Sequence, residues 1–242
     1  MPNKETQVLH HKLFTKFQKA LTQFSMLSDG DRILIGLSGG KDSLCLLEML
    51  AERQRIHKPQ IYVEAVHIRM SNIKYETDSS YLKKFASECN VKLNVIETCF
   101  DENTKTDKTK CFLCSWYRRK ALFRYAQDNK FNKIALGHHQ DDIIHTAMLN
   151  MFFQGSFSTM QATKRLNKMP ITIIRPLCLI KENDIKEYAT IRDYTKLKKN
   201  CPYEKETNRA EMRDVFSKIE SINKEARYSL WHALQKEGKL ID

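Results

Sequence analysis

The stretch ILIGLSGGKDSLCLL, residues 33–47, passes from an apolar run into a glycine pair and then into a helical pattern. The apolar run has the length of a buried strand, and leucines recur at helical spacing from Leu44 onward. The turn between them consists of Ser38, Gly39, Gly40, Lys41, Asp42 and Ser43. A structural connection needs only one glycine and a capping residue. Four polar side chains around two glycines therefore indicate that a ligand binds at this turn.

The chemistry of the turn points to a phosphate. Glycines let the main chain approach a ligand, and the start of a helix directs several N–H groups and a positive dipole end at one place. The turn is not a Walker A loop, in which four residues separate the first glycine from a GKS or GKT ending. A tight strand-to-helix connection capped by Asp42 or Ser43 is the alternative interpretation.

Strands and helices alternate along the chain. Strand-like apolar runs follow at 61–68, 92–98, 133–137 and 171–177. Helical spacing predicts helices over 5–27, 44–51, 81–89, 111–128, 141–153, 182–191 and 209–236. This alternation predicts an α/β fold with an open parallel sheet flanked by helices. Ligands bind beyond the carboxyl ends of such strands, so we expect residues 38–43, 67–72 and 137–142 to be neighbours.

Length and composition fit one large domain with extensions. In the 242 residues we expect an N-terminal helical extension over 1–28, a catalytic domain over 29–205 and a helical tail over 206–242. No apolar run approaches the ~18 residues of a membrane span, and the polar N-terminus does not resemble a signal peptide. We therefore expect a cytoplasmic protein without a membrane partner.

The charge and the cysteines narrow the function classes. Lys and Arg number 41 against 29 Asp and Glu, which is compatible with a nucleic-acid partner without requiring one. Seven cysteines without an export signal argue against a disulfide framework and leave metal or redox chemistry open. In CFLC, Cys111 and Cys114 lie within one helical turn, as in a redox pair or half a zinc site. Together with Cys201 they are sufficient for a four-iron four-sulfur cluster with one open iron; the alternative is that Cys201 is an ordinary thiol.

A second strand-to-helix junction lies in ALGHHQDDIIHTAMLNMFFQG, residues 135–155. Its two aspartates fall in the first helical turn, where negative charge is favoured. A metal set is one interpretation, and capping and surface roles are the other. The residues concerned are His138, His139, Asp142 and His145.

These motifs resemble known enzymes. SGGKDS after an apolar strand resembles the PP-loop of the N-type ATP pyrophosphatases, which adenylate a substrate and release pyrophosphate. Residues 135–155 resemble the GHHxDDxxxT segment of tRNA-modifying PP-loop enzymes. With CFLCSWYRRKAL and IIRPL, they follow the order and spacing of the tRNA 2-thiocytidine synthetase family over roughly residues 10–205. The resemblance implies a PP-loop fold and ATP-dependent thiolation of tRNA, with cytidine 32 of the anticodon loop as the expected target.

The resemblance and the strand-end rule together assign the site residues. We expect ATP to be bound by Ser38, Gly39, Gly40, Ser43, His67, Gly137 and His138. We expect Mg²⁺ and the catalytic steps to depend on Lys41, Asp42 and Asp142. The resemblance implies that a 4Fe–4S cluster is bound by Cys111, Cys114 and Cys201. We expect buried, inert thiols at Cys45, Cys89, Cys99 and Cys178.

The expected chemistry is adenylation followed by sulfur transfer. AMP makes the C2 oxygen of a pyrimidine a good leaving group, and a cluster-bound sulfide or a cysteine persulfide then displaces it. The expected partners are tRNA, a sulfur donor (persulfide from a cysteine desulfurase, or sulfide) and a second copy of the chain. Either a solvated face or a tRNA contact explains the basic and aromatic helix with Trp116, Tyr117, Arg118, Arg119, Lys120, Arg124 and Tyr125. The rival functions are a 2-thiouridine synthetase and a non-catalytic RNA- or cluster-binding module.

Overall fold

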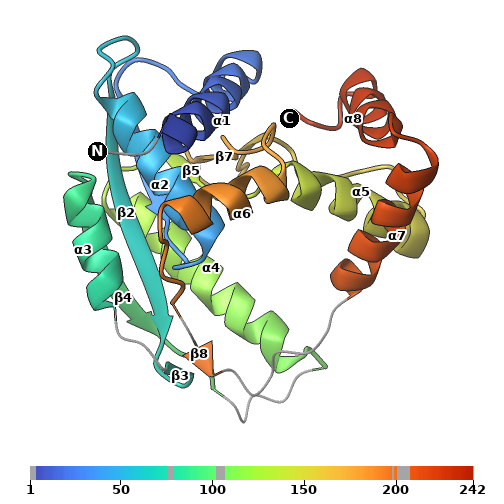
Figure 1. Ribbon diagram of the computed structural model, residues 1–242. Coiled ribbons are helices and arrows are strands. Elements are labelled where there is room, and N and C mark those ends of the chain that lie inside the picture. Colours follow the sequence, from blue (N-terminus) through green and yellow to red (C-terminus); the bar gives the residue numbers. More distant parts are fainter. Residues whose placement is uncertain (1–3, 76–78, 102–106, 198, 201–207, 242) are drawn as a thin grey trace.

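The computed structural model describes residues 4–75, 79–101, 107–197, 199–200 and 208–241 (Figure 1). Its main sheet has six strands in the order β4-β2-β1-β5-β7-β6. They are β1 (Asp31–Gly36), β2 (Ile61–Met70), β4 (Lys92–Thr98), β5 (Lys133–Ala135), β6 (Thr163–Arg165) and β7 (Thr172–Ile174). All pairs are parallel except β6 with β7. The predicted parallel sheet is thus confirmed apart from its antiparallel edge strand.

Eight described helices surround this sheet. They are α1 (Lys4–Gln23), α2 (Lys41–Gln54), α3 (Ser80–Glu88), α4 (Lys110–Asp128), α5 (Gln140–Gln154), α6 (Glu182–Ile191), α7 (Asn208–Ile222) and α8 (Ala226–Lys236). A small second sheet pairs β3 (Lys74–Tyr75) with β8 (Lys199–Asn200). None of the described helices has the length and apolarity to cross a bilayer.

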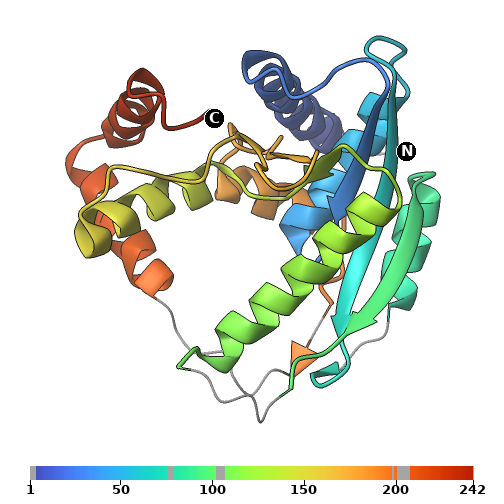
Figure 2. The same cartoon turned by 180° about the vertical axis from the view of Figure 1, so that it is seen from behind.

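Both faces of the sheet are covered because its central strands are apolar on alternate sides. Ile33 and Ile35 of β1 pack in the large cluster with α1, α2 and α6, whereas Leu34 packs in a second cluster with α4. Figure 2 shows α4 lying across that second face of the sheet. The large cluster also contains Phe17 of α1 and Trp231 of α8, so the described core is continuous across the predicted domain boundaries.

Two sequence-based expectations need correction. The single helix predicted over 209–236 is two helices, because the chain turns between Ile222 and Ala226, where the side chain of Asn223 accepts a hydrogen bond from the Glu225 amide at 2.9 Å. The stretch 155–170, without a predicted element, contains β6. A three-residue strand is too short to show a period of two.

The topology places one crevice at the centre of the sheet. The chain builds β1, β2 and β4 outward on one side and then returns to add β5 and β7 on the other. The strand order therefore reverses between β1 and β5, where open α/β sheets bind ligands. The loops after these two strands carry SGGKDS and GHHQDD, which confirms the expected neighbourhood of residues 38–43 and 137–142.

Candidate nucleotide and cluster site

Only one glycine of the SGGKDS loop needs a glycine-specific conformation. Gly39 has φ of +85°, whereas Gly40, which precedes α2, has an ordinary extended conformation. A Cβ atom on Gly39 would lie 2.6 Å from the Cβ atom of Leu197, whose amide donates to the Gly39 carbonyl at 3.0 Å. The chain after α6 thus passes directly over the loop at Leu197.

Two serines hold the loop in shape. The Ser43 hydroxyl donates to the Gly40 carbonyl at 2.8 Å and accepts from the Gly39 amide at 3.2 Å. The Ser38 hydroxyl accepts from the Gly40 amide at 3.3 Å. In the first turn of α2, the amides of Ser43 and Leu44 donate to the Gly40 carbonyl at 3.0 and 3.1 Å, and the amides of Lys41 and Asp42 come before the first intrahelical bond. These amides and the dipole of α2 form the anion-binding end of the loop.

The loop after β5 packs directly on the first turn of α2. A Cβ atom on Gly137 would lie 3.0 Å from the carbonyl carbon and oxygen of Asp42 and 3.1 Å from the amide of Ser43. Only a glycine lets the two backbones approach this closely. This contact brings the two motifs of the sequence into a single site, as predicted for Gly137.

His139 stands between the two predicted catalytic carboxylates. Its Nδ1 atom accepts a hydrogen bond from the Asp142 amide at 3.4 Å, and Asp142 accepts one from the His139 amide at 3.1 Å. With Nδ1 as acceptor, Nε2 is the ring nitrogen that is left to donate. That Nε2 atom lies 3.9 Å from Asp42 Oδ1 and 3.5 Å from Asp142 Oδ2. The structure thus brings Asp42 and Asp142 together.

The carboxylates fit the requirements of Mg²⁺. The Oδ1 atom of Asp42 is buried and has no hydrogen-bond partner among the described residues, although the Lys41 ammonium lies 3.0 Å away. No three His, Cys, Asp or Glu side chains of the described ranges form a complete metal-binding group. Mg²⁺ binds through one or two carboxylates and the substrate phosphates, and Asp42 and Asp142 are two such carboxylates.

Lys41 has a second partner that the sequence did not reveal. Its ammonium lies 3.0 Å from Asp42 and 3.2 Å from Glu182, at the start of α6. Burial opposes the charge of Lys41, but the attraction of both carboxylates prevails and raises its pKa. Glu182 is 141 positions away in sequence and belongs to none of the motifs, so no local signal identified it.

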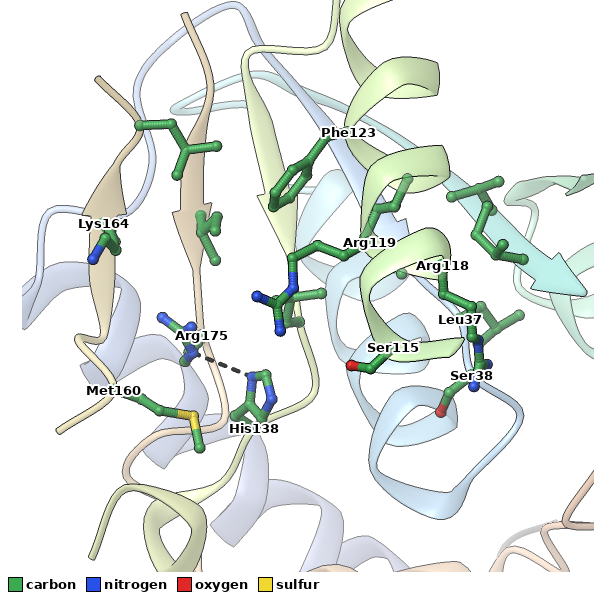
Figure 3. A pocket seen from close by; sticks show the side chains of 17 residues that line it. Leu37, Ser38, Ser115, Arg118, Arg119, Phe123, His138, Met160, Lys164 and Arg175 are labelled. Carbon is green, nitrogen blue, oxygen red and sulfur yellow. Dashed lines mark hydrogen bonds between the residues drawn. The ribbon is translucent and has the colours of Figure 1, made fainter. Parts of the chain in front are cut away.

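A cavity of about 760 Å³ opens beside the loop, between α4 and the carboxyl ends of the central strands (Figure 3). Its size is that of a small-molecule site. Apolar side chains of Val66, Ile68, Leu122, Leu136 and Ile173 line its inner part. Polar groups at its wall are Ser38, Arg118, Arg119, His138, Lys164 and Arg175. An aromatic or heterocyclic ring with an anionic group matches this lining.

The IIRPL motif contributes a buried arginine to the cavity wall. Arg175 is 8% exposed and donates from Nε to His138 Nδ1 at 3.2 Å (Figure 3). Its Nη1 group donates a hydrogen bond to the Gln161 carbonyl. Burial lowers the pKa of Arg175 to about 10, so it stays charged at neutral pH. The contact orients His138 at the cavity wall, and the predicted contact of His138 with the nucleotide stays a prediction.

His67 is hydrogen-bonded to the residue that precedes the SGGKDS loop. It is 1% exposed, and Nδ1 donates to the Leu37 carbonyl at 2.7 Å. Burial lowers the pKa of His67 and keeps the ring neutral, and two nearby arginines act in the same direction. Its neighbours on β2, Val66 and Ile68, line the cavity, so His67 points to the other face of the sheet. We therefore interpret His67 as a residue that positions the loop. Its side chain is buried and does not line the cavity, so the predicted contact with the nucleotide is not accessible to it.

The cysteines of CFLC lie in the first turn of α4, which Thr109 caps by accepting a bond from the Phe112 amide at 3.2 Å. Spacing of three residues puts Cys111 and Cys114 on one side of the helix. The third predicted ligand, Cys201, lies outside the described residues. Figures 1 and 2 place β8, just before Cys201, at the same end of the molecule as the start of α4.

Of the four cysteines expected to be buried, two are. Cys45 and Cys178 are fully buried, and burial raises the pKa of both thiols. Cys89 is half-buried, and the prediction for Cys99 is wrong. Cys99 follows the last residue of β4, an edge strand, so solvent reaches its side chain.

The basic residues of α4 do not share one surface. Arg118 and Arg119 line the cavity near Ser38 and His138 (Figure 3). Arg124, 82% exposed, pairs instead with Asp128 at 3.7 Å on the outside of the helix. Arg118 and Arg119 therefore face the nucleotide loop, whereas Arg124 faces outward, and a tRNA contact of this helix stays a prediction.

The chain was compared with known proteins. A family model described as PP-loop domain matches residues 10–216. The tRNA-cytidine(32) 2-sulfurtransferase 1 of Francisella tularensis subsp. tularensis (strain WY96-3418) is 33% identical over 231 residues, covering 93% of this chain and 86% of that protein. The tRNA-cytidine(32) 2-sulfurtransferase of Alcanivorax borkumensis is 35% identical over 190 residues, covering 77% and 66%.

The fold has a counterpart among solved structures. The U34-tRNA thiolase NcsA from Methanococcus maripaludis with its 4Fe–4S cluster superposes with a TM-score of 0.80 at 25% identity, covering 98% of this chain and 82% of that one. A phosphoadenylyl-sulfate reductase from Candida auris, with a TM-score of 0.50 at 12% identity, shows a likeness of fold alone.

Proposed function

The chain belongs to the PP-loop family, with tRNA-cytidine(32) 2-sulfurtransferases among its relatives, and from this premise we propose that it is an ATP-dependent tRNA sulfurtransferase. The proposed reaction replaces the C2 oxygen of cytidine 32 with sulfur. The observation that carries the proposal is the meeting of SGGKDS, the two carboxylates and the start of α2 beside one cavity.

The residues of the loop serve the adenylation step. The C2 oxygen attacks the α-phosphorus of ATP, and pyrophosphate leaves. The amides of the first turn of α2 and the Lys41 ammonium stabilise the charge on that leaving group. Asp42 and Asp142 would hold Mg²⁺, which would neutralise phosphate charge when bound. The cavity between α4 and the sheet holds the adenosine, with Arg118 and His138 at its rim.

The cysteines serve the sulfur step. Cys111 and Cys114 offer two soft ligands on one helix face, and we propose Cys201 as the third ligand of a 4Fe–4S cluster. When bound, such a cluster would supply one iron without a protein ligand, at which sulfide could bind. A persulfide on one of these cysteines is the alternative route. We propose that the sulfur donor is persulfide from a cysteine desulfurase, or sulfide. We also propose that the enzyme is cytoplasmic and forms a homodimer.

A 2-thiouridine synthetase is the second candidate, because the superposed thiolase is named for U34. The cytidine enzymes are nearer in sequence, at 33% and 35% identity against 25%. A non-catalytic module would not need the paired carboxylates or the Mg²⁺-compatible Asp42 oxygen.

Nucleoside analysis of tRNA tests the proposed function. A strain without the gene should lose 2-thiocytidine, as measured by mass spectrometry of digested tRNA. The wild-type gene should restore it, whereas an Asp142→Asn variant should restore at most a few per cent, because Mg²⁺ loses a ligand. Loss of 2-thiouridine with normal 2-thiocytidine would identify the second candidate as correct.

The outer face of α4 is the proposed tRNA contact. Trp116 is exposed, the Lys120 ammonium lies 5.0 Å from its ring centre, and Arg124 follows one turn later. Bases stack on such rings, and cations bind phosphates. Lys120→Gln with Arg124→Gln should weaken tRNA binding and reduce its salt slope by about 2, roughly 1 for each phosphate contact.

Lys84→Gln is the matched control for the α4 variants. Lys84 is 78% exposed and pairs with Glu88 four residues later, as Arg124 pairs with Asp128, but it lies on α3. Its replacement should change neither tRNA affinity nor salt slope, measured by filter binding from low to high salt. Equal effects of the control and the α4 variants would show a nonspecific charge effect and remove this face from the interface.

A further inference from the structure

Glu182 lies among cations from three helices. Its carboxylate is 3.2 Å from Lys41 of α2, 3.3 Å from Lys186 of α6 and 3.9 Å from Arg213 of α7. The side chain is 12% exposed, so water screens these charges less than on an open surface. Burial opposes the carboxylate charge, but the three cations prevail and lower the pKa of Glu182, which is ionised at neutral pH.

The backbone of Glu182 is anchored to α5, the helix that carries Asp142. Its amide donates to Asp141 Oδ2 at 2.7 Å, and Asp141 Oδ1 lies 2.9 Å from Arg227 of α8. Arg227 is in turn held by both carboxylate oxygens of Glu220 at 2.8 and 3.1 Å. The start of α6 is therefore tied to α5 and to the C-terminal helices, while Lys41 has a flexible stem.

A phosphate at the loop would compete with Glu182 for Lys41. The lysine ammonium is a compact point charge whose stem allows it to turn toward either anion. Every contact that it makes with Glu182 is therefore lost, or weakened, when it binds the departing pyrophosphate. A fixed carboxylate beside the lysine favours release of that product.

We propose that Glu182 is a positioning residue that holds Lys41 between turnovers and limits the affinity of the loop for pyrophosphate. The inference rests on the proposed function, in which adenylation leaves pyrophosphate on the loop. After each reaction the Lys41 ammonium leaves pyrophosphate and binds the Glu182 carboxylate of α6 again.

Calorimetric titration with inorganic pyrophosphate and Mg²⁺ tests this role. Glu182→Gln removes the competing charge and should lower the Kd about tenfold, or about 1.4 kcal/mol. Glu182→Asp retains the charge but withdraws it by one methylene, so it should give intermediate tightening. This second variant also serves if the glutamine variant does not fold. Unchanged or weaker binding in both variants would overturn the proposal.

Asp184→Asn is the matched control on the same helix. Asp184 is 13% exposed and bonds two lysines of α1, Lys12 at 3.0 Å and Lys16 at 2.8 Å, away from the loop. It undergoes the same charge change as Glu182→Gln and should leave pyrophosphate affinity within about twofold of wild type. Equal tightening in the control would mean that net charge, rather than position, sets the affinity, and would overturn the proposal.

Two further measurements separate positioning from a structural role. With ATP as the varied substrate, Glu182→Gln should lower KM and kcat together, because product release slows; a fall in kcat alone would contradict the proposal. In a Lys41→Met background the tightening should vanish, since Glu182 acts through the lysine. If wild-type protein binds no pyrophosphate, the proposed function itself fails, whereas normal binding without tightening refutes only the role of Glu182.

Discussion

Replacing Cys114 with serine is expected to remove the iron–sulfur cluster and to reduce tRNA thiolation to background. Serine oxygen is a poor ligand for iron compared with a thiolate. Cys111→Ser and Cys201→Ser should have the same effect if the three residues form the ligand set. The measurement is the iron and sulfide content of protein purified without oxygen, together with 2-thiocytidine formation in unmodified tRNA.

Cys178→Ser and Cys45→Ser are the controls for the cysteine series. Both thiols are fully buried in the large core cluster, so serine should lower the free energy of unfolding by about 1–3 kcal/mol and leave the cluster in place. All five variants should bind ATP like wild type, because the loop is unchanged. Colourless anaerobic protein that still thiolates tRNA would point to the persulfide route, and full activity of Cys114→Ser would remove that residue from the site.

Gly39→Val is expected to abolish ATP binding and, with it, every later step. The residue has φ of +85°, and its Cβ atom would lie 2.6 Å from the Cβ atom of Leu197. The new side chain must displace either the loop or the segment above it, and both changes move the amides that receive phosphate. Titration of ATP with Mg²⁺ measures the loss, with thermal unfolding recorded on the same samples.

Gly30→Val separates the loss of the site from general backbone strain. Gly30 has φ of +82°, and no described atom lies within 4 Å of its would-be Cβ atom. Both variants therefore carry a similar backbone strain of roughly 1–2 kcal/mol, to which Gly39→Val adds the clash with Leu197, and thermal unfolding should show both effects. Only Gly39→Val should lose ATP. A folded Gly39→Val variant with full ATP-dependent activity would show that the glycine turn is purely structural.

Local patterns were sufficient to predict the elements on which the site stands. The strand bounds of β4 and the bounds of α6 coincide with the predicted ranges, because apolar spacing records which side of an element is buried. The glycine turn and the aspartates after β5 indicated ligand binding because their chemistry is unusual for a connection. The α/β class followed from the alternation of elements, without knowledge of any long-range contact.

Long-range contacts decided the rest. The strand order puts the loops after β1 and β5 at one switch point, and packing then joins Lys41 to Glu182 across 141 positions and Arg175 to His138 across 37. Because α4 packs one side against the sheet, Arg118 lines the cavity whereas Arg124 faces outward. None of these pairings leaves a periodic signal, because the sequence pattern of an element records that a face is buried and not which residues bury it.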